Sequence, residues 1–267
     1  MRKRLTLAAV AAAAALTLSA SPAQAITNGV LDGNDHPYVG LVVFFNADGT
    51  PSHRCSGTMV SPTVFLTAGH CAAGVASAKI WLTPDVTTPV EPGYPNSGHD
   101  ASGTPIAHPG FTGALTIPNT HDVGIVLLDA PVALAEYGQL PAAGFLDSLA
   151  TARGTKDVTF TVVGYGLQQV VPTLESARIR YQGDAHLQNL RSHLTGGFGL
   201  QTSNNGGNWS GGTCSGDSGG PILYSDTNIV AAVNSFGLNA NCVGNDFSYR
   251  TDIADTRDFL ADYMTLP

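Results

Sequence analysis

Three short segments of this chain carry side chains that could together perform nucleophilic catalysis. Residues 214–221 place Ser218 between glycines and directly after Asp217, in a turn that can expose its hydroxyl. A serine hydroxyl is a weak nucleophile unless a neighbouring base removes its proton, and a carboxylate commonly orients that base. His70, at the end of an apolar stretch, and Asp122, at the start of another, could supply these two groups. The chemistry within reach is attack by an activated serine on a carbonyl carbon.

Each of these residues also has a simpler explanation, which the sequence leaves open. The chain holds eight histidines, and most histidines in proteins have no catalytic role. A Gly-Asp-Ser-Gly run also occurs in ordinary polar turns, where Asp217 would be a simple turn acid. His121 precedes Asp122, but we favour Asp122 as the orienting group because Asp-Val-Gly-Ile-Val begins an apolar strand.

Together with further motifs, these segments resemble the chymotrypsin/trypsin-type serine protease family. The matching residues are 26–29 (Ile-Thr-Asn-Gly), 55–71, 122–129, 164–166 (Gly-Tyr-Gly), 214–221 and 235–237 (Ser-Phe-Gly). They occur in the family's order and extend over nearly the whole mature chain. The resemblance implies an all-β fold of two six-stranded antiparallel β-barrels packed together, with a short C-terminal helix. The Ala-rich N-terminal segment further suggests a secreted bacterial member of the family.

The resemblance implies a role for each candidate residue. Ser218 would be the nucleophile, His70 the general base and later the general acid, and Asp122 the group that orients the imidazole. The backbone N–H groups of Gly216 and Ser218 would form the oxyanion hole, and glycine at position 216 suits a close backbone approach. The expected reaction is peptide-bond hydrolysis through an acyl-enzyme, with no cofactor and no metal.

The resemblance also implies activation at the N-terminus. In the family, a new α-amino group at an Ile or Val inserts into the protein and pairs with the acid before the nucleophile, here Ile26 and Asp217. We expect removal of a signal peptide to expose this group without a propeptide, although Ile26 could instead be only the first ordered strand residue. A free α-amine has a pKa of about 7.7–8.0, which pairing would raise. The stabilisation would be present below the free value and lost as the pH rises through the raised one.

The resemblance assigns a primary substrate pocket, formed by Gly212 and Thr213 at the base and by Ser235, Phe236 and Gly237 along one wall. Trypsins carry an acid at the position of Gly212. A neutral base disfavours Lys or Arg before the scissile bond, because the buried cation would be unpaired. We therefore expect a preference for small or medium uncharged side chains.

Two neighbouring residues could change this preference. Phe247 stands roughly where the family often has glycine, and it could narrow the pocket. Asp246, directly before it, could restore an acid to the pocket if the correspondence is shifted by one residue.

The chain has four cysteines, which are Cys55, Cys71, Cys214 and Cys242. In an exported protein an even number of cysteines indicates disulfides, and four cysteines allow three pairings. Pairing Cys55 with Cys71 would staple the segment before His70, and pairing Cys214 with Cys242 would tie the nucleophile segment to a later strand. A metal site is the competing interpretation, but no pair has the close Cys-x-x-Cys spacing typical of zinc sites. We expect two disulfides.

The first 25 residues have the composition of a secretory signal peptide. A basic start precedes a short apolar run and the small-residue pattern Ala-Gln-Ala that ends at Ala25. The run is shorter than the ~20 apolar residues of a membrane helix, although a retained anchor is the alternative. We therefore expect a secreted, extracellular protein.

Charge limits the partners of the mature chain. The full chain has a net charge of −8, and removal of the signal takes three of the twelve Lys and Arg and none of the twenty acids, which leaves −11. Nucleic acid and anionic membranes need a basic surface, so neither is expected as a partner. The resemblance implies protein or peptide substrates, with proteinaceous protease inhibitors as further candidates, and a monomer.

Strand patterns are short and scattered, at residues 38–45, 57–60, 63–67, 123–128, 158–163, 221–224 and 229–235. Residues 83–104 and 183–212 are rich in Gly, Pro, Asn and Ser and are expected to be long surface loops. Near the C-terminus, Asp255 is expected to cap a helix. The expected domains are a signal peptide at 1–25 and a peptidase domain at 26–267, with barrel one at about 26–135, barrel two at about 136–250 and the helix at about 253–264.

Two other functions compete with a serine endopeptidase. A catalytically silent, protease-like scaffold can serve only to bind a partner, because a fold does not guarantee a function. Such proteins usually lose a triad member, whereas His70, Asp122 and Ser218 are all present. An esterase is disfavoured because its nucleophile lies in Gly-x-Ser-x-Gly and its triad follows the order Ser, Asp, His.

Overall fold

Apolar and β-branched residues in the first half of the chain form six antiparallel strands that close into a barrel, which we call barrel one. The computed structural model describes residues 26–149, 158–170, 174–204 and 211–267, so the predicted signal peptide lies outside the described residues. The strands are β2 (Val39–Phe45), β3 (Pro51–Ser61), β4 (Val64–Thr67), β5 (Ser77–Trp81), β6 (Ala101–Ala107) and β7 (Gly124–Leu128). Their order is β2-β3-β4-β7-β6-β5, and pairing of β2 with β5 closes the barrel.

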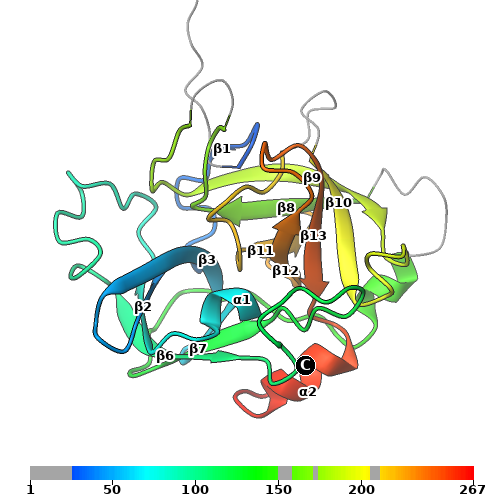
Figure 1. Cartoon of the computed structure of the whole chain (residues 1–267), viewed down its shortest axis with the longest axis horizontal. Helices are drawn as coiled ribbons and strands as arrows, with labels where there is room; N and C mark the ends of the chain where they lie inside the picture. Colours follow the sequence, from blue (N-terminus) through cyan, green and yellow to red (C-terminus); the bar gives the residue numbers. More distant parts are fainter. Residues whose placement is uncertain (1–25, 150–157, 171–173, 205–210) are drawn as a thin grey trace, which may run out of the picture.

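The second half of the chain forms a second six-stranded barrel, barrel two, beside the first (Figure 1). Its strands are β8 (Thr159–Gly164), β9 (Tyr181–Asn189), β10 (Gly199–Asn204), β11 (Pro221–Tyr224), β12 (Val230–Gly237) and β13 (Gly244–Arg250). They follow the order β9-β10-β13-β12-β11-β8, and pairing of β8 with β9 closes the ring. The prediction of two six-stranded antiparallel barrels is therefore confirmed.

One strand crosses from the start of the chain to the second barrel. The two-residue strand β1 (Val30–Leu31) pairs with the beginning of β9, while β10 pairs with the end of β9. The N-terminal segment is thus attached to barrel two, although it precedes all the strands of barrel one.

In the described part of the chain, three short helical segments accompany the barrels: α1 (Gly69–Ala72), the 3₁₀ helix η1 (Phe145–Leu149) and the C-terminal helix α2 (Ala254–Ala261). The C-terminal helix is confirmed, but its expected cap is not. Ile253 is the N-cap residue, and Asp255 lies in the first turn. No helix among the described residues is long and apolar enough to span a membrane.

The expectation of a long surface loop at residues 183–212 is wrong. Most of β9 and all of β10 lie there, and β10 alternates strictly between half-buried and buried residues. Two of the inward-facing residues of β10 are Thr202 and Asn204, which are polar. The strand therefore lacks the apolar alternation that would reveal it in the sequence. The expected loop at 83–104 likewise includes the start of β6.

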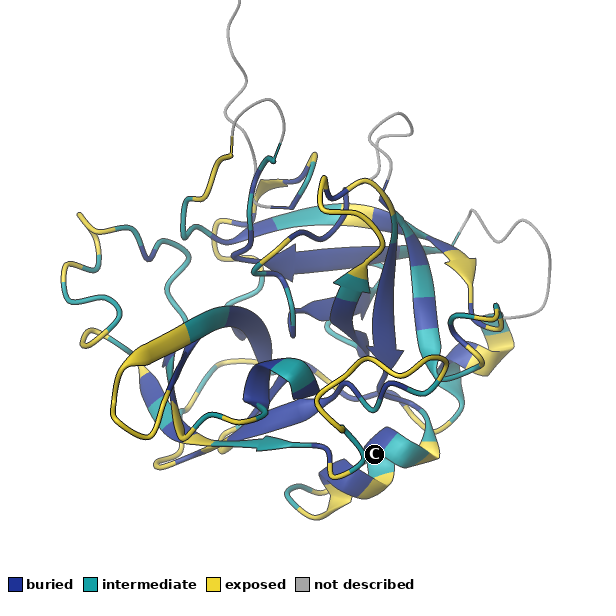
Figure 2. Cartoon of the chain, in the orientation of Figure 1, coloured by how far each residue is buried: buried dark blue, intermediate teal, exposed yellow. Residues whose placement is uncertain are grey.

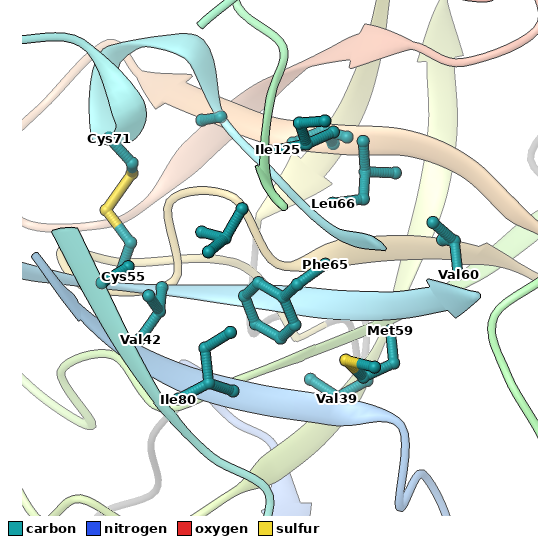
Figure 3. Packing of buried hydrophobic residues seen from close by; sticks show 14 of the residues in the cluster. Val39, Val42, Cys55, Met59, Val60, Phe65, Leu66, Cys71, Ile80 and Ile125 are labelled. Atoms are coloured by element: carbon teal, nitrogen blue, oxygen red, sulfur yellow. A yellow bond between two sulfur atoms is a disulfide. The ribbon is translucent and has the colours of Figure 1, made fainter. Parts of the chain in front are cut away.

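Buried apolar side chains fill both barrels, and much of their strands is coloured as buried in Figure 2. In barrel one, Val42, Phe65 and Ile80 come from three strands and meet in one cluster (Figure 3). The disulfide between Cys55 and Cys71 lies at the edge of this cluster. The second disulfide joins Cys214 to Cys242, so the expected pairing is confirmed.

A buried arginine joins the N-terminal segment to both barrels. The Arg180 side chain is fully buried, and its Nε donates to Asp32 Oδ2 at 2.6 Å. Its other nitrogens donate to the carbonyl oxygens of Val39 and Leu82, among other acceptors. Burial alone would raise the pKa of Asp32, but the hydrogen bond from His36 and the charge of Arg180 lower it.

Replacing Arg180 with alanine is expected to destabilise the protein by about 3–5 kcal/mol, because Asp32 would keep a buried charge without its cation. Urea denaturation would measure the change, with each substitution made in a Ser218→Ala background. The exposed Arg191→Ala serves as the matched control and should cost less than about 0.5 kcal/mol. Equal stabilities of the two variants would contradict the role given to Arg180.

Candidate active site

The ends of β4 and β7 bring His70 and Asp122 together. These strands pair antiparallel, with Thr67 opposite Gly124, so the residues just after β4 and just before β7 are neighbours. His70 lies in α1, directly after β4. A Cβ atom on the adjacent Gly69 would lie 3.0 Å from the Val123 carbonyl oxygen, so glycine permits this close approach.

The Asp122 carboxylate holds His70 by two groups. Asp122 Oδ2 lies 2.8 Å from His70 Nδ1, and Oδ1 accepts the backbone N–H of His70 at 2.7 Å. The Asp122 side chain is fully buried, whereas that of His70 is 30% exposed. A carboxylate accepts but does not donate, so the imidazole proton lies on Nδ1 and the lone pair of Nε2 is free to accept a proton.

Ser235, which was predicted only as part of the pocket wall, also contacts the buried acid. Its hydroxyl donates to Asp122 Oδ2 at 2.5 Å. Because Ser235 belongs to β12, this bond links an acid beside barrel one to barrel two. No feature of the sequence pattern pointed to this contact.

Ser218 lies in a turn that is docked onto barrel one through Ser56 of β3. The Ser56 N–H donates to the Ser218 carbonyl oxygen at 2.9 Å, and the Ser56 hydroxyl donates to the Gly216 carbonyl oxygen at 3.0 Å. Gly219 packs so closely that a Cβ atom there would lie 2.9 Å from the nitrogen of Ala68. These contacts bring the Ser218 turn beside the residues that precede His70.

The backbone around Ser218 is strained in a way that glycine allows. Gly216 has a φ of 100°, which favours glycine. Among the described residues, the N–H groups of Gly216 and Ser218 have no hydrogen-bond acceptor, and Ser218 Oγ forms no hydrogen bond with His70 Nε2. Catalytic hydrogen bonds often tighten only when substrate is bound.

Asp217 is buried beneath this turn. Its two oxygens accept the N–H groups of Gly166, at 2.8 Å, and Cys214, at 2.9 Å. Burial raises the pKa of Asp217 to about 7, against the lowering effect of these two bonds. Within the described residues no cation forms an ion pair with it.

Ile26 is also fully buried, in the apolar cluster of barrel two. The next residue, Thr27, exchanges two backbone hydrogen bonds with Gly212, at 2.9 and 3.1 Å. This pairing brings the N-terminal segment against the segment that leads to Asp217.

A cavity of about 320 Å³ adjoins Ser218. Four of the predicted pocket residues line it: Thr213, Ser235, Phe236 and Gly237. Gly212 does not line the cavity and lies behind Thr213, paired with Thr27.

Asp246 and Phe247, the two residues that could change the preference of the pocket, lie in different places relative to the cavity. Asp246 lines the cavity, whereas Phe247 does not. The Phe247 ring stacks on that of Phe236 at 4.9 Å, so Phe247 does not narrow the cavity. An acid therefore faces the pocket from β13, although the expected base position is neutral.

A second cluster of titratable groups lies next to Asp122. His121 Nδ1 is 2.8 Å from Asp255 Oδ2, and the Tyr249 hydroxyl donates to the same oxygen at 2.5 Å. His108 Nδ1 accepts the N–H of Gly110 at 3.0 Å, so the proton of the neutral ring lies on Nε2. That nitrogen faces Asp255 and has no lone pair for a metal, so the cluster is better described as a hydrogen-bonded clamp on the loop that carries Asp122.

Solved structures share this fold. HL collagenase is 18% identical, with a TM-score of 0.69, over 89% of this chain and 98% of that chain. A variant of human heparin binding protein (CAP37) is also 18% identical, with a TM-score of 0.63, over 91% of this chain and 98% of that chain. The two barrels and the His–Asp pair define a protein of the chymotrypsin fold.

The family model described as Trypsin matches residues 31–260, and the chain belongs to this family of chymotrypsin-like serine endopeptidases. Serine protease 7 of Drosophila melanogaster is 26% identical, over 88% of this chain and 65% of that protein. Brachyurin of Leptuca pugilator is 28% identical, over 70% of this chain and 77% of that protein.

Proposed function

We propose that this chain is a serine endopeptidase in which Ser218, His70 and Asp122 form the catalytic triad. The observation that carries the proposal is the imidazole of His70, which is held by buried Asp122 through Nδ1, so that the lone pair lies on Nε2. Ser218 Oγ attacks the scissile carbonyl carbon while Nε2 takes its proton. His70 then gives this proton to the leaving amine, and water repeats the sequence on the acyl-enzyme.

The oxyanion of each tetrahedral intermediate would be stabilised by the N–H groups of Gly216 and Ser218. Two observations support this assignment: the positive φ of Gly216 and the lack of any other acceptor for these two groups within the described residues. Each donor of this kind is worth roughly 3 kcal/mol of barrier.

Activation would follow exposure of the Ile26 amino group. Ile26 and Asp217 are both buried, and a charged group in either place needs a partner. The pairing of Thr27 with Gly212 brings the two segments together. An ion pair between the new ammonium and Asp217 would hold the Ser218 turn in its working conformation.

The same proposal includes secretion and peptide or protein substrates. It rests on the N-terminal segment at residues 1–25 and on the family. Heparin binding, which the name of one solved structure suggests, is a different function. Heparin is a polyanion, whereas the mature chain would carry a net charge of −11, so we disfavour this binding function.

The test is the intact mass of the secreted protein before and after treatment with a serine-directed organophosphonate. We expect a mass that begins at Ile26 and one adduct, absent from Ser218→Ala and present in the exposed control Ser148→Ala. A folded protein that begins at Ile26 and takes up no adduct would overturn the proposal and favour a catalytically silent binding protein.

A further inference from the structure

A second cavity, of about 450 Å³, lies at the far end of β11 from Ser218. β11 begins at Pro221, close after Ser218, and its other end leads into the turn at residues 225–229, which carries Asp226. None of the described residues that line this cavity lines the pocket beside Ser218. The second cavity is therefore separate from the candidate active site.

Three carboxylates stand around this second cavity, which we call the acidic cavity. Asp35 follows β1, Glu136 lies between β7 and η1, and Asp226 lies between β11 and β12. All three residues are exposed, and within the described residues none of them forms an ion pair. No Lys or Arg is among the described residues that line the cavity. Exposed acids alone do not indicate a ligand, but they favour a cation over an anion as the occupant.

A buried tyrosine lies at the same cavity. Tyr38 lines the acidic cavity although it is only 2% exposed. Its hydroxyl has no hydrogen-bond partner in the described part of the chain, whereas buried tyrosine hydroxyls ordinarily have one. Burial raises the pKa of Tyr38, and the charges of Glu136 and Asp32 raise it further. The positive charge of Arg180, which is engaged by Asp32, acts in the opposite direction. The hydroxyl therefore keeps its proton, lies within the field of Glu136 and is left to a partner from the cavity.

The side-chain donors around the acidic cavity are already engaged with the protein. The hydroxyl of Thr161 and the amide nitrogen of Asn228 donate to backbone carbonyl oxygens, each at 3.1 Å. The amide nitrogen of Gln182 donates to Asp35 Oδ2 at 3.0 Å. The other two carboxylates of the cavity accept no hydrogen bond from the described residues. A ligand that complements this lining carries N–H donors and a positive charge.

The spacing of the acids favours an extended cation over a metal ion. Within the described residues, no three carboxylate or imidazole ligand atoms of this cavity lie within 4.8 Å of one another, whereas calcium takes about six to eight oxygen ligands. A guanidinium group instead carries several N–H donors in one plane and can reach separated acceptors. The rings of His36 and Tyr38 meet edge to face, with centroids 5.9 Å apart, and offer an aromatic wall to its methylene stem.

We propose that the acidic cavity binds an arginine side chain of a polypeptide partner, whose guanidinium donates to Glu136 and to the Tyr38 hydroxyl. Asp35 and Asp226 add negative charge at the rim. Free arginine is the other source of a guanidinium, but its own carboxylate would be repelled by the three acids. The inference does not depend on the proposed function, because the acidic cavity and the pocket beside Ser218 share no described residue.

The test is calorimetric titration of the mature protein with an acetylated, amidated peptide of glycine that contains two arginines. A Ser218→Ala background keeps the probe intact. The triple variant Asp35→Asn, Glu136→Gln, Asp226→Asn is expected to weaken binding at least about tenfold, because it removes the charge of the cavity. The control is Asp48→Asn, Asp129→Asn, Asp258→Asn, which changes the net charge equally at exposed sites elsewhere and should change the affinity by less than about twofold.

The probe itself is varied in the same titration. A peptide with citrulline in place of both arginines keeps the shape but loses the charge, and it should not bind. Replacing both arginines with lysine should weaken binding about threefold, because an ammonium is a compact group that cannot bridge two separated acceptors. Free arginine should bind more weakly than the peptide.

Tyr38→Phe separates a binding role from a structural one. It removes only the hydroxyl, so it should weaken binding of the arginine peptide about fivefold, the value of one hydrogen bond. The urea midpoint of this variant should stay equal or rise, since no bond within the described protein is lost. Tyr263→Phe, on the partly buried Tyr263 near the C-terminus, is the control and should keep the affinity of the parent.

Four results would overturn the inference. Equal affinities of the two triple variants would mean that the peptide follows net charge or binds elsewhere, the cleft beside Ser218 included. An unchanged affinity in Tyr38→Phe would mean that water satisfies the hydroxyl. Equal binding of the arginine and citrulline peptides would remove the cation from the argument, and free arginine binding as tightly as the peptide would remove the polypeptide. None of these results bears on the phosphonate adduct, so the proposed function is tested separately.

Discussion

Asp122→Asn is expected to lower kcat about 10⁴-fold, the magnitude known for the equivalent change in this family. Asp122 Oδ2 accepts both the Nδ1 proton of His70 and the hydroxyl hydrogen of Ser235. An asparagine NH₂ group at this place would donate instead, and it would favour the imidazole tautomer whose proton lies on Nε2. His70 could then no longer accept the proton of Ser218.

Steady-state kinetics on a peptide amide would measure this loss, and thermal unfolding would verify that the variant is folded. Asp129→Asn is the matched control, because Asp129 is exposed and accepts only the hydroxyl of Ser102 and no histidine. A loss of less than about tenfold in Asp122→Asn would show that Asp122 does not set the tautomer.

One alanine added before Ile26 is expected to lower kcat/KM about 10²–10³-fold, comparable to the loss of an oxyanion donor. The extra residue moves the α-ammonium away from Asp217, which then remains buried without a cation. The turn that carries Gly216 and Ser218 would lose the ion pair that fixes it. Activity of the extended protein equal to that of the mature form would contradict the activation proposal.

The extended protein should also become less stable as the pH rises from about 4 to about 7. Burial raises the folded-state pKa of Asp217 to about 7 from an ordinary value of 3.8. In that interval the folded protein binds one proton more than the unfolded chain, so the free energy of unfolding falls with rising pH. The total change in the free energy of unfolding over this pH interval is at most about 4 kcal/mol.

Urea denaturation at several pH values would measure this slope in Ser218→Ala proteins with and without the added alanine. In the protein that begins at Ile26, the ammonium would pair with Asp217 and remove most of the slope. An added alanine after Pro267 is the control and should leave the slope as in the mature form. Equal slopes with and without the N-terminal alanine would argue against the ion pair.

The sequence was sufficient to predict the fold class, the disulfides and the family, because short motifs carry that information. Six of the predicted strand patterns, all rich in β-branched and aromatic residues, coincide largely with β2, β4, β7, β8, β11 and β12. The motif around His70, with Cys71 beside it, predicted both a base and one half of a disulfide. Strand patterns and short motifs depend on residues that are close together in the sequence, so the sequence alone can reveal them.

Other features depend on contacts between distant residues and were not predictable. β10 turns Thr202 and Asn204 inward, and the amide of Asn204 is held there by polar partners that include Thr27. The register of β10 against β13 sets Thr202 opposite Asp246, and only that register puts the acid in the pocket. The bond from Ser235 to Asp122 spans 113 positions in the chain.

The hydrogen bonds of Ser56 matter for molecules in which the two barrels separate transiently. It belongs to barrel one and holds the carbonyl oxygens of Gly216 and Ser218 from barrel two. If the barrels separate, the turn loses these bonds just as strands become accessible to cleavage. With the triad assigned above, an opened copy can be cut by its neighbours but cannot cut them. In a concentrated solution, self-digestion would therefore cleave molecules with separated barrels first. The molecules with closed barrels would remain as the active population.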